Sequence, residues 1–177
     1  MNIERRREKE REKYFKLQQE KPKYGATNHG SGATSHVVAS KPTMVADFGC
    51  GRNNFINNLK KLGIEGCGID FVYDEADIIA PMHDVPLEDG SADFITAFDS
   101  LEHLLCEDVD LVFNEMRRVA VPGCGFCFSI AYRPSVITVR GENLHPTVRA
   151  KKWWMRKIRK FADVKGMKRR YIIGNFK

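Results

Sequence analysis

Short, largely apolar runs alternate along the chain with stretches whose apolar residues recur at helical spacing. The short runs predict buried strands over 45–47, 65–70, 77–80, 93–98 and 124–131. The helically spaced stretches predict helices over 54–62, 108–120 and 151–161. Strands that alternate with helices in this way indicate an α/β protein with a mostly parallel sheet.

The two ends of the chain follow different patterns. Residues 3–20 are strong helix formers with few apolar members, which predicts an exposed helix that docks through Tyr14, Phe15 and Leu17. We therefore divide the chain into a charged N-terminal helical extension, 1–22, and a single domain, 23–177. Within that domain, 23–38 is rich in Gly, Ser and Thr and is expected to order only against other parts of the protein. Strand-like stretches at 162–169 and 171–176 predict a closing antiparallel hairpin.

The segment 45–55, VADFGCGRNNF, contains the most informative turn of the sequence. Gly49 and Gly51 would let the backbone adopt positive φ and bring a ligand against N–H groups at the start of a helix. Asp70 follows about twenty positions later, where an acidic residue would hold ribose hydroxyls. A dinucleotide fingerprint requires Gly or Ala at the position of Asn54, so this turn predicts a different nucleotide ligand.

With Asp47 and Cys50 included, the turn resembles the first motif, D-x-G-C-G-x-G, of the class I S-adenosylmethionine (SAM)-dependent methyltransferases. Asn53 replaces the third glycine, and asparagine tolerates the left-handed conformation. The segment 76–104, with V-P-L at 85–87 and L-E-H-L at 101–104, is similar to the same family. The chain is identified as a small member of phage or bacterial type, with specific resemblance from 45 to 131. The resemblance implies a Rossmann-like α/β fold: a mostly parallel seven-stranded sheet, helices on both faces, and a C-terminal antiparallel hairpin.

The resemblance also implies which residues contact the cofactor, SAM. One departure is Pro81, which stands where the family commonly has an acidic residue that reaches the adenine. Backbone groups of Met82 and His83 would take over that contact. The expected cofactor-binding residues are Asp47, Gly49, Cys50, Gly51, Asn53, Asp70, Phe71, Met82, His83, Phe98 and Asp99.

Candidate catalytic and acceptor-binding residues lie in the segments expected around the carboxyl edge of the sheet. The candidate catalytic residues are His145, Asp99 and His103, and the candidates for the base are His145, His29 and Asp99. The alternative for Glu102 and His103 of L-E-H-L is bracing of a helical turn. Side chains suited to an anionic or ring-containing acceptor are Tyr24, His29, Arg133, Arg140 and Trp153, and His36 is a further candidate. No metal site is predicted, because Cys124 and Cys127 would face opposite sides of a strand.

Charge and composition narrow the function further. The chain has 177 residues and a net charge of +6. Residues 1–23 carry nine Lys/Arg and five Asp/Glu, and residues 149–170 carry eleven Lys/Arg and one Asp/Glu. Residues 24–148, in contrast, carry eight Lys/Arg and seventeen Asp/Glu. Basic ends on an acidic body suggest a nucleic acid, an anionic metabolite or an acidic protein as partner, or only solubilising helices. The sequence has no apolar segment of membrane-spanning length and no signal-peptide core, and five cysteines fit a reduced, cytoplasmic protein with no membrane partner.

The predicted function is methyl transfer from SAM to an oxygen or nitrogen of a polar, anionic small molecule or nucleotide. A nucleic-acid methyltransferase is the first alternative, although the sequence D-S-L-E at 99–102 is neither the [DNS]-P-P-[YF] element nor the Pro-Cys element of base-modifying enzymes. The second alternative is a non-catalytic binding or scaffold protein on the same fold.

Overall fold

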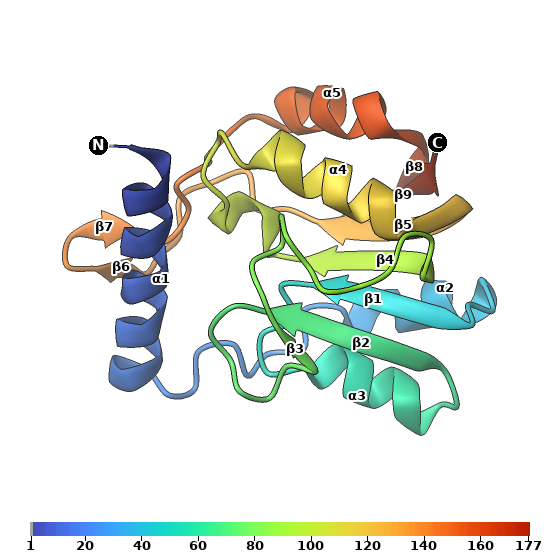
Figure 1. Ribbon diagram of the computed structural model, residues 1–177, viewed down its shortest axis with the longest axis horizontal. Coiled ribbons are helices and arrows are strands. Elements are labelled where there is room, and N and C mark those ends of the chain that lie inside the picture. The colour runs from blue at the N-terminus through green and yellow to red at the C-terminus, as the bar shows by residue number, and fades with distance from the viewer. Residues whose placement is uncertain (1) are drawn as a thin grey trace.

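A seven-stranded sheet forms the centre of the molecule in the computed structural model, which describes residues 2–177 (Figure 1). The strand order is β3-β2-β1-β4-β5-β9-β8. The first five are parallel, and β9 and β8 complete the sheet as an antiparallel hairpin. This is the predicted Rossmann-like topology. The strands are β1 Met44–Phe48, β2 Glu65–Asp70, β3 Ile78–Ile79, β4 Ala92–Phe98, β5 Ala120–Ser129, β8 Ala162–Lys168 and β9 Tyr171–Phe176.

Helices cover both faces of the sheet (Figure 1). Helices α4 (Val109–Val119) and α5 (Lys151–Phe161) lie over one face, and α2 (Thr34–Ala39) and α3 (Asn54–Lys61) lie over the other. Each face has its own apolar core, because successive side chains of a strand point in opposite directions. In β5, for example, Cys124 belongs to the core under α4 and α5, while Cys127 belongs to the other. The predicted separation of this C-x-x-C pair is thus confirmed.

Several predicted elements have the observed boundaries or nearly so. The strand β2 and the helix α5 begin and end where predicted, and α5 buries Trp154, Ile158 and Phe161 as expected. The part of the chain between β2 and β3 contains no helix, also as predicted. These elements are specified by short-range patterns of apolar residues, so the sequence alone suffices to find them.

Other boundaries differ from the prediction. The helix α2 lies in a segment expected to be irregular, and it forms because Val37 is fully buried in the core beside α3. The strand β5 begins at Ala120, directly at the end of α4, rather than at the predicted residue 124. The segment V-P-G at 121–123 is therefore part of the strand, which has a register shift against β4. The predicted apolar faces included Leu62 and Leu111, but both side chains are about half exposed.

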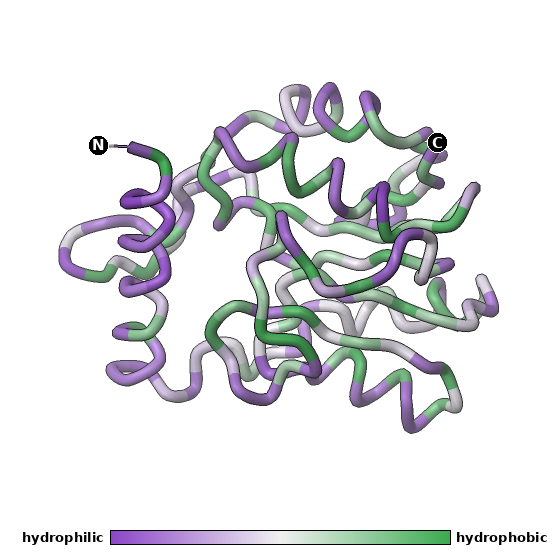
Figure 2. The backbone as a smooth tube through the Cα atoms, viewed as in Figure 1, coloured by the Kyte–Doolittle hydropathy of each residue, from purple (hydrophilic) through white to green (hydrophobic). Residues whose placement is uncertain are grey.

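A small hairpin and the N-terminal helix stand at the carboxyl edge of the sheet (Figure 1). The hairpin consists of β6 (Thr138–Val139) and β7 (Glu142–Asn143), and α1 covers Ile3–Glu20. Helix α1 is mostly hydrophilic (Figure 2), yet Tyr14 and Leu17 are buried in a third apolar cluster with residues that follow β2 and residues of the hairpin region. The expected docking of α1 is therefore observed, although Phe15 remains 44% exposed.

Ion pairs hold the first turns of α1 against the domain. Arg7 binds Asp108 just before α4, and Arg6 binds the neighbouring Glu107. Lys9 binds Glu142 of β7. Part of the basic charge at the N-terminal end is thus neutralised by acidic residues of the body. No helix among residues 2–177 is long and apolar enough to cross a membrane.

Candidate active site

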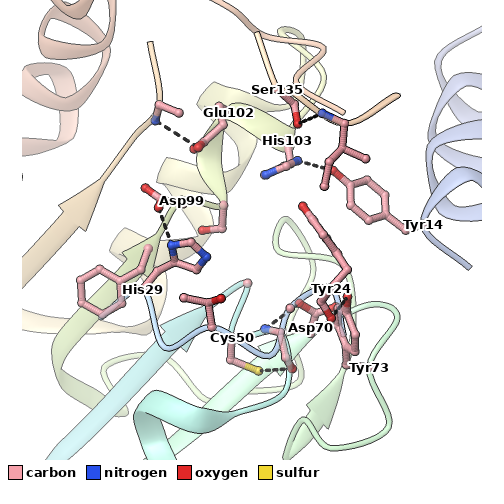
Figure 3. A pocket seen from close by; sticks show the side chains of 18 of the residues that line it. Tyr14, Tyr24, His29, Cys50, Asp70, Tyr73, Asp99, Glu102, His103 and Ser135 are labelled. Atoms are coloured by element: carbon pink, nitrogen blue, oxygen red, sulfur yellow. Dashed lines mark hydrogen bonds and ion pairs between the residues drawn. The ribbon is translucent and has the colours of Figure 1, made fainter. Parts of the chain in front are cut away.

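A cavity of about 590 Å³ lies at the carboxyl ends of the parallel strands, under α1 (Figure 3). Its volume falls within the roughly 300–1,000 Å³ that is usual for small-molecule sites. Its walls come from the segment before α2, the turn after β1, the end of β2, the residues after β4 and the segment between β5 and α5. These are the loops that the parallel topology brings to one edge of the sheet.

The turn after β1 has the backbone conformation expected from its sequence. Gly49, Gly51 and Asn53 all have positive φ, and Asn53 is left-handed immediately before α3. A Cβ atom on Gly49 would lie 2.5 Å from side-chain atoms of Met82 and Ser100. One on Gly51 would meet only Gly25, at 3.4 Å, and would otherwise occupy the cavity. The turn therefore presents bare backbone to a ligand.

Asp70 ends β2 on the floor of the same cavity (Figure 3). Its Oδ2 accepts a hydrogen bond from the backbone N–H of Gly51 at 3.0 Å, and its Oδ1 accepts one from Val72 at 3.0 Å. Burial raises the pKa of this carboxyl, against the lowering effect of these N–H groups. Each carboxylate oxygen has a second lone pair, so Asp70 can still accept two hydroxyl groups from a ligand.

Asp47 lies at the end of β1 and is only 2% exposed. Its Oδ1 accepts a hydrogen bond from the hydroxyl of Thr96 at 2.7 Å. Burial raises the pKa of Asp47 to about 6. Burial also raises the pKa of the Cys50 thiol far above its ordinary value, so this cysteine is not poised to act as a nucleophile.

Asp99 follows β4 and is held by three side chains. His29 and Arg170 contact its Oδ2, with the His29 Nδ1 atom at 2.8 Å, and the Ser129 hydroxyl donates to its Oδ1 at 2.9 Å. Burial opposes ionisation, but these partners outweigh it and hold the pKa of Asp99 well below its usual range. Such a carboxylate is a weak base. The same contacts explain how Asp99 keeps a left-handed backbone, with φ of 49°, at the edge of the cavity.

Glu102, His103 and His145 form a second polar group in the cavity. One potential ligand atom from each lies within 4.8 Å of the other two, and the two imidazole rings meet edge to face at 4.6 Å between centroids. Burial raises the pKa of Glu102 to about 8 and lowers the pKa of His103 to about 3. Both side chains are therefore neutral at pH 7 in the absence of a ligand.

Some residues predicted to contact the cofactor lie outside the cavity. Asn53 turns its amide toward Asp77, whose Oδ2 accepts from its Nδ2 at 2.9 Å, so its contribution is the turn conformation. His83 is not among the lining residues, although its neighbour Met82 is. The other predicted cofactor residues line the cavity, namely Asp47, Gly49, Cys50, Gly51, Asp70, Phe71, Met82, Phe98 and Asp99.

Two of the predicted acceptor residues also lie elsewhere. Trp153 was expected to be free to line a pocket, but it packs edge to face on Trp154 and lies under the cation of Lys157. Arg140 is exposed at the turn between β6 and β7. His36 faces Phe94 instead, on α2. Tyr24, His29 and Arg133 do line the cavity, as do His103 and His145.

Several lining residues were not predicted from the sequence, among them Lys21, Lys23 and Tyr73. Tyr14 projects from α1, and its hydroxyl contacts Nδ1 of His103 and donates to the carbonyl oxygen of Leu144 at 3.1 Å. Tyr73 lines the opposite part of the cavity, where its hydroxyl donates to the Tyr24 carbonyl oxygen at 3.1 Å. Glu102 was noted only as part of L-E-H-L. For Tyr14 the apolar last turns of α1 were the available signal; nothing local marked the others.

Comparison with known proteins places this site in a family. Residues 46–128 match the sequence model described as a methyltransferase domain. This segment contains the glycine turn, Asp70 and the L-E-H-L element. The matched segment is a methyltransferase domain of the class I SAM-dependent type. No curated protein matches the sequence.

Solved structures share the methyltransferase fold at low sequence identity. The 1,6-didemethyltoxoflavin-N1-methyltransferase of Burkholderia thailandensis, with bound 1,6-didemethyltoxoflavin and S-adenosylhomocysteine, has a TM-score of 0.70 and 12% identity over 94% of this chain and 85% of that one. A Pyrococcus horikoshii OT3 protein has a TM-score of 0.67 and 18% identity, over 92% and 99%. A SAM-dependent methyltransferase of Aquifex aeolicus has a TM-score of 0.58 and 16% identity, over 92% of this chain and 95% of that one.

The cavity of this methyltransferase fits its cofactor, SAM, by an observation independent of these comparisons. The side of Gly51 where a Cβ would stand is open to the cavity, so a ligand can lie directly against the backbone of the turn. The carboxylate of Asp70 lies beside that turn with lone pairs to spare. A nucleoside with a free ribose matches this combination of bare backbone and acceptor oxygens.

Proposed function

We propose that this methyltransferase transfers a methyl group to an oxygen or nitrogen atom of a polar, anionic small molecule or nucleotide. The observation that carries the proposal is the charge on the cavity wall. Lys21, Lys23 and Arg133 line the cavity, and none of them forms an ion pair within residues 2–177. Free cations around a cavity favour a ligand that carries negative charge.

The cofactor is assigned to the part of the cavity around the first two strands. The backbone of Gly49 and Gly51 and the carboxylate of Asp70 would hold it, with Met82 and Phe71 as apolar contacts. When bound there, SAM supplies an electrophilic methyl group on its sulfonium. The protein must then align the acceptor with that methyl group and exclude water.

The acceptor is assigned to the region under α1. Tyr14 and Tyr24 close it from outside, while His103, His145 and Arg133 contribute polar groups. Asp99 does not suit the role of base, since its carboxylate is engaged by His29 and Arg170. The Nδ1 atom of His145 lies 2.7 Å from the carbonyl oxygen of Arg133, which accepts its proton in a hydrogen bond. The free lone pair of His145 is then on Nε2, and we assign this atom as the base that takes the proton lost by the acceptor.

The basic ends of the chain bear on the nucleic-acid alternative. Lys157 and Lys160 of α5 both pair with Asp110 of α4, and the cations at the start of α1 pair with Glu107 and Asp108. These ion pairs neutralise only part of the positive charge at the ends, because Lys157, Lys160 and Arg170 are the only three of the eleven Lys/Arg at 149–170 that form one within residues 2–177. The unpaired cations that line the cavity, Lys21, Lys23 and Arg133, favour a cavity-sized anionic acceptor over a long nucleic acid. The five free cysteines agree with action in a reducing compartment such as the cytoplasm.

The experiment that tests this function combines calorimetry with an acceptor screen. We expect SAM and S-adenosylhomocysteine to bind the purified protein with one-to-one stoichiometry. Transfer of labelled methyl is then measured on matched pairs of small molecules, each with and without its phosphate or carboxylate. Higher kcat/KM for the anionic member, decreasing as ionic strength rises, is the expected result. No binding at millimolar cofactor would contradict the proposal and favour the scaffold alternative.

A further inference from the structure

Three side chains of the acceptor region, among them the candidate base His145, also form a possible ligand set for a metal ion. Glu102 and His103 lie in the short 3-10 turn after β4, and His145 lies in the segment before α5 (Figure 3 shows the first two side by side). Candidate ligand atoms of the three are within 4.8 Å of one another. Bonds of about 2.0–2.2 Å to one ion require separations near 3.3 Å. Side-chain adjustments of about 1.5 Å or less would therefore bring all three onto a single ion.

Both imidazoles are already oriented by backbone carbonyl groups. Nδ1 of His103 is 2.9 Å from the carbonyl oxygen of Leu144, and Nδ1 of His145 is 2.7 Å from that of Arg133. A carbonyl oxygen only accepts, so each Nδ1 carries the proton and each Nε2 carries a lone pair. Histidines that bind metals are usually held in this way, by a hydrogen bond from the second ring nitrogen.

Glu102 provides an independent indication that a ligand is missing. The residue is fully buried, and its Oε1 accepts a hydrogen bond from the N–H of Ala131 at 3.0 Å. Its other oxygen, Oε2, is buried and has no hydrogen-bond partner within residues 2–177. A buried carboxyl oxygen with no partner is destabilising unless something binds it. The residue lies in the wall of the cavity next to the two imidazoles, where a cation would satisfy it.

We propose that Glu102, His103 and His145 bind a divalent transition-metal ion, of the Zn²⁺, Mn²⁺ or Co²⁺ class, in the acceptor region of the cavity. Two imidazole nitrogens and one carboxylate suit these ions, whereas Mg²⁺ and Ca²⁺ favour oxygen ligands alone. Three protein ligands leave at least one coordination position open. This ligand set is not recognisable from the sequence, because 42 positions separate His145 from His103.

This site deepens the proposed function and rests on it, because all three candidate ligands line the part of the cavity assigned to the acceptor. An acceptor hydroxyl that ligates the ion there would have a lowered pKa and would lose its proton to water. Its oxygen then forms the O–CH₃ bond while the S–CH₃ bond breaks, and that electron pair remains on sulfur. The substrate class would thereby narrow to hydroxylated anions. With the ion bound, Nε2 of His145 would act as a ligand, and the ion would replace it in the role of base that is assigned to it above.

The test is titration of the metal-stripped full-length protein with Co²⁺, followed by visible absorption and calorimetry. We expect one equivalent to bind, and we expect Glu102→Gln and His145→Asn to weaken binding at least 10-fold. The matched control is His36→Asn, because His36 lies on α2 outside the cavity. This variant should bind Co²⁺ as wild type does. Absence of binding, or equal effects in the control and the cavity variants, would overturn the proposal.

A second measurement keeps the proposal testable if the variants do not fold. In the wild-type protein, Co²⁺ should protect His103 and His145, but not His36, from diethylpyrocarbonate, as mapped by mass spectrometry. Equal modification of all three with and without Co²⁺ would overturn the site. Calorimetry with S-adenosylhomocysteine, run on the same samples, separates the two proposals. Cofactor binding without Co²⁺ binding would contradict only the proposed metal site. Co²⁺ binding without cofactor binding would contradict the proposed methyltransferase function.

Discussion

The hydroxyl group of Tyr14, on the N-terminal helix, contacts the imidazole of His103 in the turn after β4. The sequence places these two residues in different parts of the protein, a charged extension and the catalytic domain. In the structure Tyr14 is 7% exposed, packs edge to face on Phe71 and also donates to the Leu144 carbonyl oxygen. Helix α1 is therefore part of the cavity wall. The N-terminal segment 1–22, which we set apart as an extension on the basis of its sequence, contributes to the site.

We expect Tyr14→Phe to lower the free energy of unfolding by about 1 kcal/mol. The substitution keeps the ring contacts but removes the buried hydroxyl and leaves the Leu144 carbonyl with fewer donors. Phe15→Leu is the control, since Phe15 is 44% exposed and its replacement should change stability by less than about 0.5 kcal/mol. Urea denaturation measures both. An unchanged midpoint for Tyr14→Phe would show that α1 does not dock through this residue in solution.

Asp70→Asn should weaken binding of S-adenosylhomocysteine by about 1–3 kcal/mol, or roughly 5- to 150-fold. The substitution replaces a carboxylate, whose oxygens remain available to ribose hydroxyls, by a neutral amide. Asp74→Asn, an exposed carboxylate four residues further on, is the matched control and should leave affinity unchanged. Calorimetry decides between the outcomes. Equal affinity of wild type and Asp70→Asn would mean that the ribose lies elsewhere.

A pair of glycine substitutions separates backbone strain from loss of ligand space. Gly51 and Gly141 both have positive φ, at 55° and 79°, so alanine at either should cost stability on the order of 1 kcal/mol. A Cβ on Gly141 would have no neighbour within 4 Å, but one on Gly51 would occupy the cavity. We therefore expect Gly51→Ala alone to weaken cofactor binding, by at least 10-fold. Similar cofactor affinity in both variants would contradict the assignment of the cofactor to this turn.

The buried carboxyl of Asp47 predicts a specific pH dependence of stability. Its pKa is raised to about 6 in the folded protein, mainly by burial, against about 3.9 in an unfolded chain. A raised pKa means that the unfolded chain releases this proton first, so Asp47 lowers the stability progressively as pH rises from about 4 to 6. Asp47→Asn keeps an acceptor for Thr96 without the charge.

We expect Asp47→Asn to be more stable than wild type by about 1–3 kcal/mol at pH 8, and the two proteins to converge near pH 4. Thermal or urea denaturation of the free protein across this pH range measures the difference. A difference that does not change with pH would mean that Asp47 is ionised in both states throughout.

The amino-acid sequence by itself determined the local elements and the cofactor turn. Helix α5, strand β2 and the left-handed Asn53 were predictable because apolar periodicity and backbone preference operate over a few residues. Asp70 was predictable because a turn and the end of the neighbouring parallel strand have a near-constant spacing. In each case the information lies within one or two adjacent elements.

Tertiary structure alone decided the acceptor side of the site. Arg170 reaches Asp99 across 71 positions, and that contact turns a candidate base into a weak one. Trp153 was placed correctly on its helix but packs on Trp154 instead of lining the cavity. His145 joins Glu102 and His103 only because the segment after β5 folds back over the end of β4. Such contacts depend on side-chain packing between segments distant in sequence, for which periodicity carries no signal.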